Sequence, residues 1–211
     1  MATTLAEVAQ RAGVSLATAS RVLNGSTHGV TADLRARVLT AAQALDYVPN
    51  AHAQALARSS SAIVGVLVHD VSDPYFSEIM RGIQRVASDA SRLVITCNSY
   101  RDPARELDYV RLLHGHRVEA LILAGSGLDE RTYSQRMASQ IAAFTASGGR
   151  VAFIGRHHVL GDAVVPDNVG GARAMGHTLA RLGHQRIGVI DGPALLTTSR
   201  DRIDGFRSGL R

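Results

Sequence analysis

The sequence of 211 residues has no lysine, no tryptophan, one cysteine and only 4% aromatic residues. No apolar run approaches the length of about 18 residues that a membrane-spanning helix needs. The only apolar stretch near the start is interrupted by Glu7, Gln10 and Arg11, which argues against a secretory signal. We therefore expect a cytoplasmic location. Cys97 lies in the apolar run LVITC and has no second cysteine to pair with, so we expect a buried structural thiol.

The basic residues are all arginine. They number 23 against 18 acidic residues, a formal net charge of +5. Such a balance suits an anionic partner such as DNA, but the first sixty residues carry only five arginines against three acids, so charge alone is a weak indication. A hydrophobic content of 45% is typical of a globular protein with a sizeable core.

Three short helices are predicted in the first fifty residues. Thr4 and Glu7 have the spacing of a capping box, and Gly13 ends the first helix in a left-handed conformation. Ser15 is expected to cap the second helix and Thr31 the third. The third helix places its apolar residues on one stripe, Leu34, Val38, Ala41, Ala42 and Leu45.

The second helix, within GVSLATASRVLNG, carries few long apolar side chains and repeated hydroxyls. Two helices joined by a tight turn with glycine form a helix-turn-helix, whose second helix enters the DNA major groove. The hydroxyls of Ser15, Thr18 and Ser20 are suited to phosphates and base edges, and Arg21 to guanine or phosphate. An ordinary three-helix bundle with soluble faces is the alternative.

The run TLAEVAQRAGVSLATASRVLNG closely resembles the headpiece of the lactose/galactose-repressor (LacI/GalR) family of transcription regulators. The family pattern is T-x-x-D/E-V-A-x-x-A-G-V-S-x-x-T-V-S-R-V-L-N, and only Ala19, where valine is common, departs noticeably. Leu16 and Ala17 occupy the two variable positions that select the operator in this family. Both are apolar here, which suits contact with thymine methyl groups.

The segment DYVPNAHAQALAR resembles the hinge helix of the same family. A helix of about eight residues is too short to be stable alone, so it should fold when paired with its twin on DNA. The resemblance implies that Leu56 wedges into the minor groove and kinks the DNA; packing of Leu56 on the next domain is the alternative. The expected DNA-binding residues are Thr4, Ser15, Leu16, Ala17, Thr18, Ser20, Arg21, Asn24, Asn50, Ala53 and Leu56.

A different pattern follows the headpiece at 1–49 and the hinge and linker at 50–61. Unbroken apolar runs without alternation are typical of strands buried on both faces, and helices between them give right-handed crossovers. Residues 62–211 are therefore predicted to form a doubly wound parallel α/β domain. The expected strands are IVGVLV, LVITC, EALILAG, VAFIG and RIGVI. The expected helices lie near 76–89, 104–114, 129–147, 168–182 and 201–211.

This second region resembles the periplasmic-binding-protein-like effector domain of the same repressors, through SDPYFSEIMRGI, RVEALIL, VPDN, LGHQRIGVIDGP and RIDGF. Parallel sheets bind ligands at the carboxyl ends of their strands. By position, the resemblance implies effector contacts at Tyr75, Phe76, Arg156, Thr198 and Arg202, which suit a sugar or nucleobase. Phe76 could equally be core. The pair Asp167-Asn168 is expected to cap the following helix rather than touch ligand.

Signals for catalysis or cofactors are weak. The GSG sequence at 125–127 lacks the third glycine of a dinucleotide loop, and there is no P-loop or Cys-x-x-Cys. The pair His157-His158 has no spaced carboxylate or cysteine partner, and no serine has the setting of a nucleophile elbow. We expect no enzyme, no cofactor and no metal.

Members of the resembled family are considerably longer, and this chain stops at Arg211 inside an amphipathic pattern without a capping signal. We therefore expect a C-terminally truncated chain with a begun second lobe and no normal effector response. The prediction is a DNA-binding regulator, most often a repressor, with a pseudo-palindromic operator and a small-molecule effector. It would be a homodimer if the missing part is supplied. The alternatives are a sugar-binding protein of the same α/β fold and a DNA-only or non-functional remnant.

Overall fold

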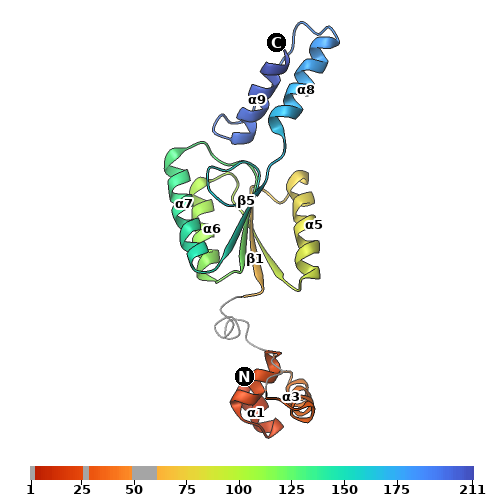
Figure 1. The fold of residues 1–211 in the computed structure, drawn as a ribbon, viewed down its shortest axis with the longest axis vertical. Helices are drawn as coiled ribbons and strands as arrows, with labels where there is room; N and C mark the ends of the chain where they lie inside the picture. Colours follow the sequence, from red (N-terminus) through yellow and green to blue (C-terminus); the bar gives the residue numbers. More distant parts are fainter. Residues whose placement is uncertain (1–2, 26–28, 49–60) are drawn as a thin grey trace. The chain divides into compact units, whose positions relative to one another are not determined.

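The computed structural model describes residues 3–25, 29–48 and 61–211. The chain divides into two units, Met1–Ser61 and Ala62–Arg211 (Figure 1). The predicted hinge helix at 50–58 lies outside the described residues.

Helices α1 (Leu5–Ala12), α2 (Leu16–Leu23) and α3 (Ala32–Ala44) form the first unit. The side chains of Thr4, Ser15 and Thr31 each accept a hydrogen bond from a first-turn amide of the helix that follows, as predicted. Gly13 closes α1 at φ 64°, a left-handed conformation that costs glycine little. The buried residues that hold the three helices together are Val8, Ala9, Ala12, Ala19, Val22, Val38, Ala41 and Ala42.

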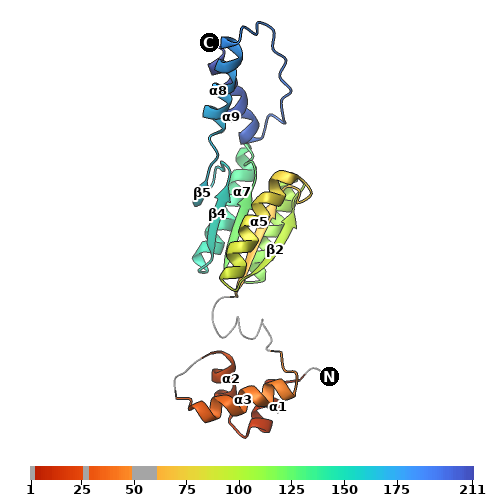
Figure 2. The same ribbon diagram turned by 90° about the vertical axis from the view of Figure 1, so that its right-hand side faces the viewer.

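A parallel five-stranded sheet forms the centre of the second unit, with strand order β2-β1-β3-β4-β5 (Figures 1 and 2). The strands are β1 (Ile63–Val68), β2 (Leu93–Asn98), β3 (Ala120–Ala124), β4 (Arg150–Ile154) and β5 (Asp162–Val164). The helices between them are α5 (Pro74–Asp89), α6 (Pro103–Gly115) and α7 (Arg131–Ala146). The order reverses between β1 and β3, which is where such sheets bind ligands.

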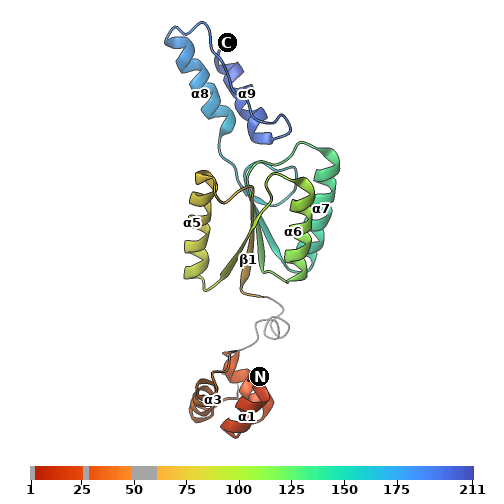
Figure 3. The ribbon, with the colours of Figure 1, turned by 180° about the vertical axis from the view of Figure 1, so that it is seen from behind.

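The two faces of the sheet are covered unequally. Helix α5 packs on one face through Phe76 and Met80, against the buried side chains of β1. Helices α6 and α7 cover the other face (Figure 3). Met137 and Phe144 of α7 are almost fully buried there. Strand β1 has the two-sided burial that its unbroken apolar run predicted, whereas the edge strand β2 is at most half-buried and its Leu93 is exposed.

The prediction of a strand at RIGVI is wrong. Residues 186–190 form no regular element, and Ile190 is fully exposed at 102%. A strand needs a neighbouring ladder for its backbone groups, and none of the described strands pairs with this run. The fifth strand is instead the short, exposed β5, which the sequence pattern did not predict.

Helices α8 (Asn168–Arg181) and α9 (Thr197–Gly209) lie side by side (Figures 1 and 3). Helix α9 begins at Thr197 rather than near 201, directly after the bridge between Leu128 and Leu196. Glycines allow close contact of the two helices: a methyl group at Gly176 would lie 2.5 Å from the Phe206 carbonyl oxygen. The α8–α9 segment is therefore held by the close packing of its two helices and by the bridge to Leu128, in the loop after β3.

Candidate functional site

The turn between α1 and α2 is held from outside by α3. The Arg37 guanidinium donates to the Ala12 carbonyl oxygen at 2.6 Å and to the Gly13 carbonyl oxygen at 3.3 Å. These carbonyls end α1, where helices leave acceptors without intrahelical partners. Arg37 was not singled out from the sequence, because nothing in its spacing indicates a contact 24 residues away.

Helix α2 has two distinct sides. Ala19 and Val22 are buried against α1 and α3. Leu16, Ala17 and Arg21 are exposed, and Leu16 keeps 54% of its surface accessible. Ala17 and Arg21 are four residues apart and therefore lie on the same face of the helix. The exposed surface that these two residues and Leu16 contribute is here called the α2 outer face.

The hydroxyls of α2 are held within the helix. Ser15 Oγ accepts from the Thr18 amide at 3.1 Å and lies 2.9 Å from Thr18 Oγ1. The Asn24 side chain donates to Ser20 Oγ at 3.2 Å. Thr4 serves as the α1 cap in a complete capping box with Glu7. These hydroxyls therefore have local structural roles in addition to the DNA contacts predicted for them.

Three of the predicted DNA-binding residues, Asn50, Ala53 and Leu56, lie outside the described residues. Their predicted roles at the DNA stay predictions.

A cavity of about 290 Å³ opens at the carboxyl end of the sheet, at the reversal of strand order between β1 and β3. Loops after all five strands and the first turns of α5, α8 and α9 contribute to it. Its lining residues are His69, Asp73, Tyr75, Phe76, Arg101, Gly125, Ser126, Gly155, Pro166, Asn168, Leu196, Thr198 and Arg202. We call it the sheet-end pocket.

Four of the five predicted effector residues line this pocket: Tyr75, Phe76, Thr198 and Arg202. Tyr75 is exposed, and Phe76 is 4% exposed, so Phe76 belongs both to the core and to the pocket wall. Their rings meet edge to face at 5.2 Å. Arg202 donates from Nε to Asn168 Oδ1 at 2.9 Å, which links α9 to α8.

Arg156 does not line the pocket. Its guanidinium forms a two-pronged ion pair with Asp201, Nε to Oδ2 at 2.9 Å and Nη2 to Oδ1 at 2.6 Å. The hydrogen bonds to Asp201 raise the pKa of Arg156 further. The Thr197 hydroxyl also donates to the Arg156 carbonyl oxygen at 2.8 Å. Arg156, in the loop after β4, therefore connects the sheet to the N-terminal part of α9 through Thr197 and Asp201.

A buried polar cluster lies beneath the pocket. Glu106 accepts hydrogen bonds from the Ser99 hydroxyl at 3.0 Å and from the Tyr133 hydroxyl at 2.5 Å. His69 Nε2 lies 3.7 Å from Glu106 Oε1. Burial raises the pKa of Glu106, whereas burial and the nearby Arg101 lower the pKa of His69 to about 4. His69 is therefore neutral near pH 7, and it lines the sheet-end pocket.

Sequence reasoning missed His69, Asp73, Arg101 and Ser126 as pocket residues, and it assigned Asn168 to a helix cap. Asp167 does cap α8, accepting from the Gly170 amide at 2.8 Å, but Asn168 lines the pocket. The missed side chains follow β1, β2 and β3. The rule that ligands bind at the carboxyl ends of strands could have identified them.

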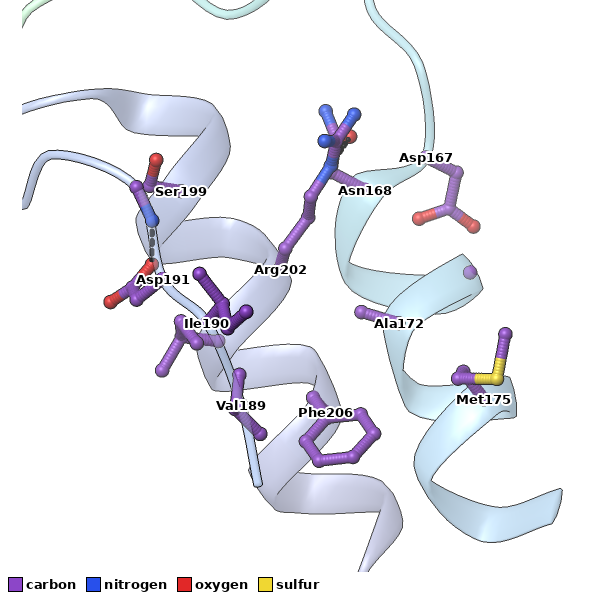
Figure 4. Close-up of a pocket in the computed structure, with 13 residues that line it drawn as sticks. Asp167, Asn168, Ala172, Met175, Val189, Ile190, Asp191, Ser199, Arg202 and Phe206 are labelled. Atoms are coloured by element: carbon purple, nitrogen blue, oxygen red, sulfur yellow. Dashed lines mark hydrogen bonds between the residues drawn. The ribbon is translucent and has the colours of Figure 1, made fainter. Parts of the chain in front are cut away.

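A second cavity, of about 520 Å³, lies between α8, α9 and residues 189–192. Met175, Val189, Ile190 and Phe206 make much of its wall apolar, and Arg202 extends toward Asn168 at one end (Figure 4). The exposed Ile190 side chain forms part of this wall. Val189 and Ile190 belong to the run RIGVI, so residues that were predicted to form a strand instead line this cavity.

Within the described ranges, no group of three or more histidine, cysteine or carboxylate residues has the arrangement of a metal site. His158 instead lies 3.5 Å from Asp129. Cys97 lies in β2 but is half-buried rather than buried as predicted, because β2 is an edge strand, and its partial burial raises the pKa of the thiol. No helix among the described residues is long and apolar enough to cross a membrane.

Two family models match the chain. Residues 4–50 match "Bacterial regulatory proteins, lacI family", and residues 61–211 match "Periplasmic binding proteins and sugar binding domain of LacI family". Together they include the α2 outer face and the sheet-end pocket.

Curated relatives and solved structures agree with these matches. The chain is 37% identical over 99% of its length to the transcriptional regulator GalS of Salmonella typhimurium, and 32% identical over 97% to the ribose operon repressor of Halalkalibacterium halodurans. It spans 59% of the length of each. A lac repressor dimer bound to operator and the anti-inducer ONPF superposes with a TM-score of 0.79 at 28% identity, covering all of this chain and 62% of that one.

Proposed function

The chain belongs to the lacI family of bacterial regulatory proteins, and from that premise we propose that it is a sequence-specific, DNA-binding transcriptional repressor whose affinity for DNA responds to a small-molecule effector. The observation that carries the proposal is the α2 outer face. It consists of exposed Leu16, Ala17 and Arg21 on a helix whose opposite side is buried. A rigid helix with one free side is what major-groove recognition requires.

In this proposal the α2 outer face reads base edges. Leu16 and Ala17 contact thymine methyl groups, and Arg21 donates to guanine or phosphate. The residues Thr4, Ser15, Thr18, Ser20 and Asn24 position the headpiece on the phosphates. In the hinge, Asn50 and Ala53 contact the minor groove and Leu56 is the wedge that kinks it.

Two copies bind a pseudo-palindromic operator, one headpiece on each half-site. The lac repressor structure, a dimer on its operator, supports this arrangement. The role also implies a cytoplasmic location and no catalysis. The named relatives are transcriptional regulators rather than enzymes.

The sheet-end pocket is the proposed effector site. Tyr75, Phe76, Thr198 and Arg202 contact the ligand, and Arg156 positions α9 through Asp201. A ligand here touches the strand loops and the first turns of α8 and α9 at once. It therefore favours one arrangement of these elements over others, which is the differential contact that a regulatory ligand needs.

Titration of a duplex recovered by selection from a random library tests the DNA role. With the 211-residue chain, Arg21→Ala should weaken binding by about 1–3 kcal/mol. Arg21→Lys separates the two possible contacts, because lysine keeps the charge for a phosphate but loses the two-pronged geometry for guanine. The control is Arg81→Ala on the exposed side of α5. Unchanged affinity of Arg21→Ala would contradict the assigned role.

A further inference from the structure

Positively charged side chains outnumber negatively charged ones among the described residues that line the sheet-end pocket. Among its described lining residues are two guanidinium groups, Arg101 and Arg202, and one carboxylate, Asp73. Asp73 accepts from the Tyr75 amide at 2.9 Å and so caps α5. His69, which also lines the pocket, is neutral near pH 7 because burial and the charge of Arg101 lower its pKa to about 4. The pocket is therefore electropositive.

Arg101 extends into the pocket from a strained turn after β2. Tyr100 and Arg101 both have left-handed backbones, at φ 53° and 60°. Residues other than glycine pay a conformational cost there, and such strain gathers at functional sites. Hydrogen bonds fix the turn, from the Tyr100 amide to the His69 carbonyl oxygen at 2.7 Å and from the Asp102 amide to the Ser99 carbonyl oxygen at 3.0 Å.

The Arg101 guanidinium has no described carboxylate within 4.0 Å, whereas Arg156, Arg200 and Arg92 all do. Hydrogen bonds from the Ser72 amide and hydroxyl to Asp70, together with the charge of Arg101, lower the pKa of Asp70. Arg101 is thus a positive charge at the pocket wall that no carboxylate in contact neutralises.

Three helices start at this pocket. Asp73 and Tyr75 begin α5, Asn168 begins α8, and Leu196 and Thr198 begin α9. Helix N-termini carry partial positive charge and favour anions. Helix α9 has Leu196 at its N-cap position, without a side-chain cap hydrogen bond. The backbone thus adds to the positive potential of the two guanidinium groups.

We propose that the effector is a small anionic polyol, a sugar acid or sugar phosphate, and that Arg101 and Arg202 bind its charged group. This inference rests on the proposed effector role of the pocket. The volume of about 290 Å³ is at the lower end of ligand sites, roughly 300–1,000 Å³, and suits one sugar ring. The exposed Tyr75 ring provides a face for that ring, and arginine forks match carboxylate and phosphate oxygens.

Calorimetric titration of the 211-residue chain with matched probes tests the inference. The probes are glucose, galactose and ribose, their aldonic acids, and glucose 6-phosphate, galactose 6-phosphate and ribose 5-phosphate. At least one anionic probe should bind roughly tenfold or more tightly than its neutral parent, because its hydrogen bonds to arginine are charge-assisted. Preference for the aldonate or for the phosphate identifies which anion is recognised.

The variant Arg101→Gln should abolish the preference for the anionic probe, weakening its binding roughly tenfold or more, because the charge-assisted hydrogen bonds to that guanidinium are lost. Arg105→Gln is the matched control, since Arg105 lies on α6 over the Tyr100 ring and does not line the pocket. Neutral probes binding as tightly as anionic ones would overturn the inference while the effector role stands. No binding by any probe would also overturn the inference, and operator titration measures the DNA role independently.

Discussion

The sequence patterns predicted the secondary structure of the headpiece better than that of the α8–α9 segment. In the headpiece, the caps Thr4, Ser15 and Thr31 and the left-handed Gly13 all form as predicted. In the α8–α9 segment, the apolar run at 186–190 stays irregular. A cap needs only residues within the same turn, whereas a strand needs a neighbour. A short sequence pattern therefore predicts an element reliably when the groups that complete its hydrogen bonds lie in the same turn, and less reliably when they lie on another strand.

The largest expected effect comes from the side of the sheet that α6 and α7 cover. Phe144 is 1% exposed within that core. Phe144→Ala should destabilise the second unit by about 3–5 kcal/mol through the lost burial and the cavity left behind. Urea titration followed by amide NMR signals checks this, with Thr145→Ala as the control on the same helix. If the headpiece signals shift with Phe144→Ala, the two units do not unfold separately.

The next largest effect is expected from acid, which should lower the free energy of unfolding of the second unit more than that of the headpiece. Burial lowers the pKa values of His69 and His157 from 6.5 to about 4. The unfolded chain then binds these protons first, so the second unit loses stability as pH falls from about 6.5 to about 4. The loss is roughly 3 kcal/mol per histidine at the acid end. The raised pKa of Glu106 acts in the opposite direction, since it favours the folded state at low pH.

The described headpiece residues contain no histidine. Contacts with Thr4 lower the pKa of Glu7, so the stability from Glu7 is lost only as pH falls below its ordinary value of 4.5. Between pH 7 and pH 5, urea midpoints from headpiece signals should stay constant while those of the second unit fall. Equal slopes in both units would contradict the burial of the two histidines.

A smaller effect is expected where α8 and α9 pack. Gly176→Ala places a methyl group 2.5 Å from the Phe206 carbonyl oxygen, a backbone atom that cannot easily move. The cost should be about 1–3 kcal/mol. Gly171→Ala on the same helix meets nothing within 4 Å and should stabilise by about 0.5–1 kcal/mol, because alanine favours the helix. The two melting temperatures should move in opposite directions; movement in the same direction would contradict the close helix contact.

Sequence patterns predicted the sheet well and the site in part. Strands β1 to β4 follow from unbroken apolar runs, and the pocket lies where parallel order reverses. The pairing of Arg156 with Asp201 and of Arg37 with the Ala12 carbonyl oxygen depends on contacts 45 and 25 residues apart. No local spacing encodes such contacts. Arg101 was missed for a different reason: it follows the predicted strand LVITC, and the rule that parallel sheets bind ligands at the carboxyl ends of their strands was not applied to it.

Binding-site selection tests the central claim, recognition of operator DNA by the α2 outer face, most directly. The wild-type chain and a Leu16→Gln, Ala17→Arg variant are each selected against the same random duplex library. The two side chains are exposed on α2, so the variant should fold normally and recover a different consensus. An unchanged consensus, or none with the wild-type chain, would contradict recognition by this face of the helix.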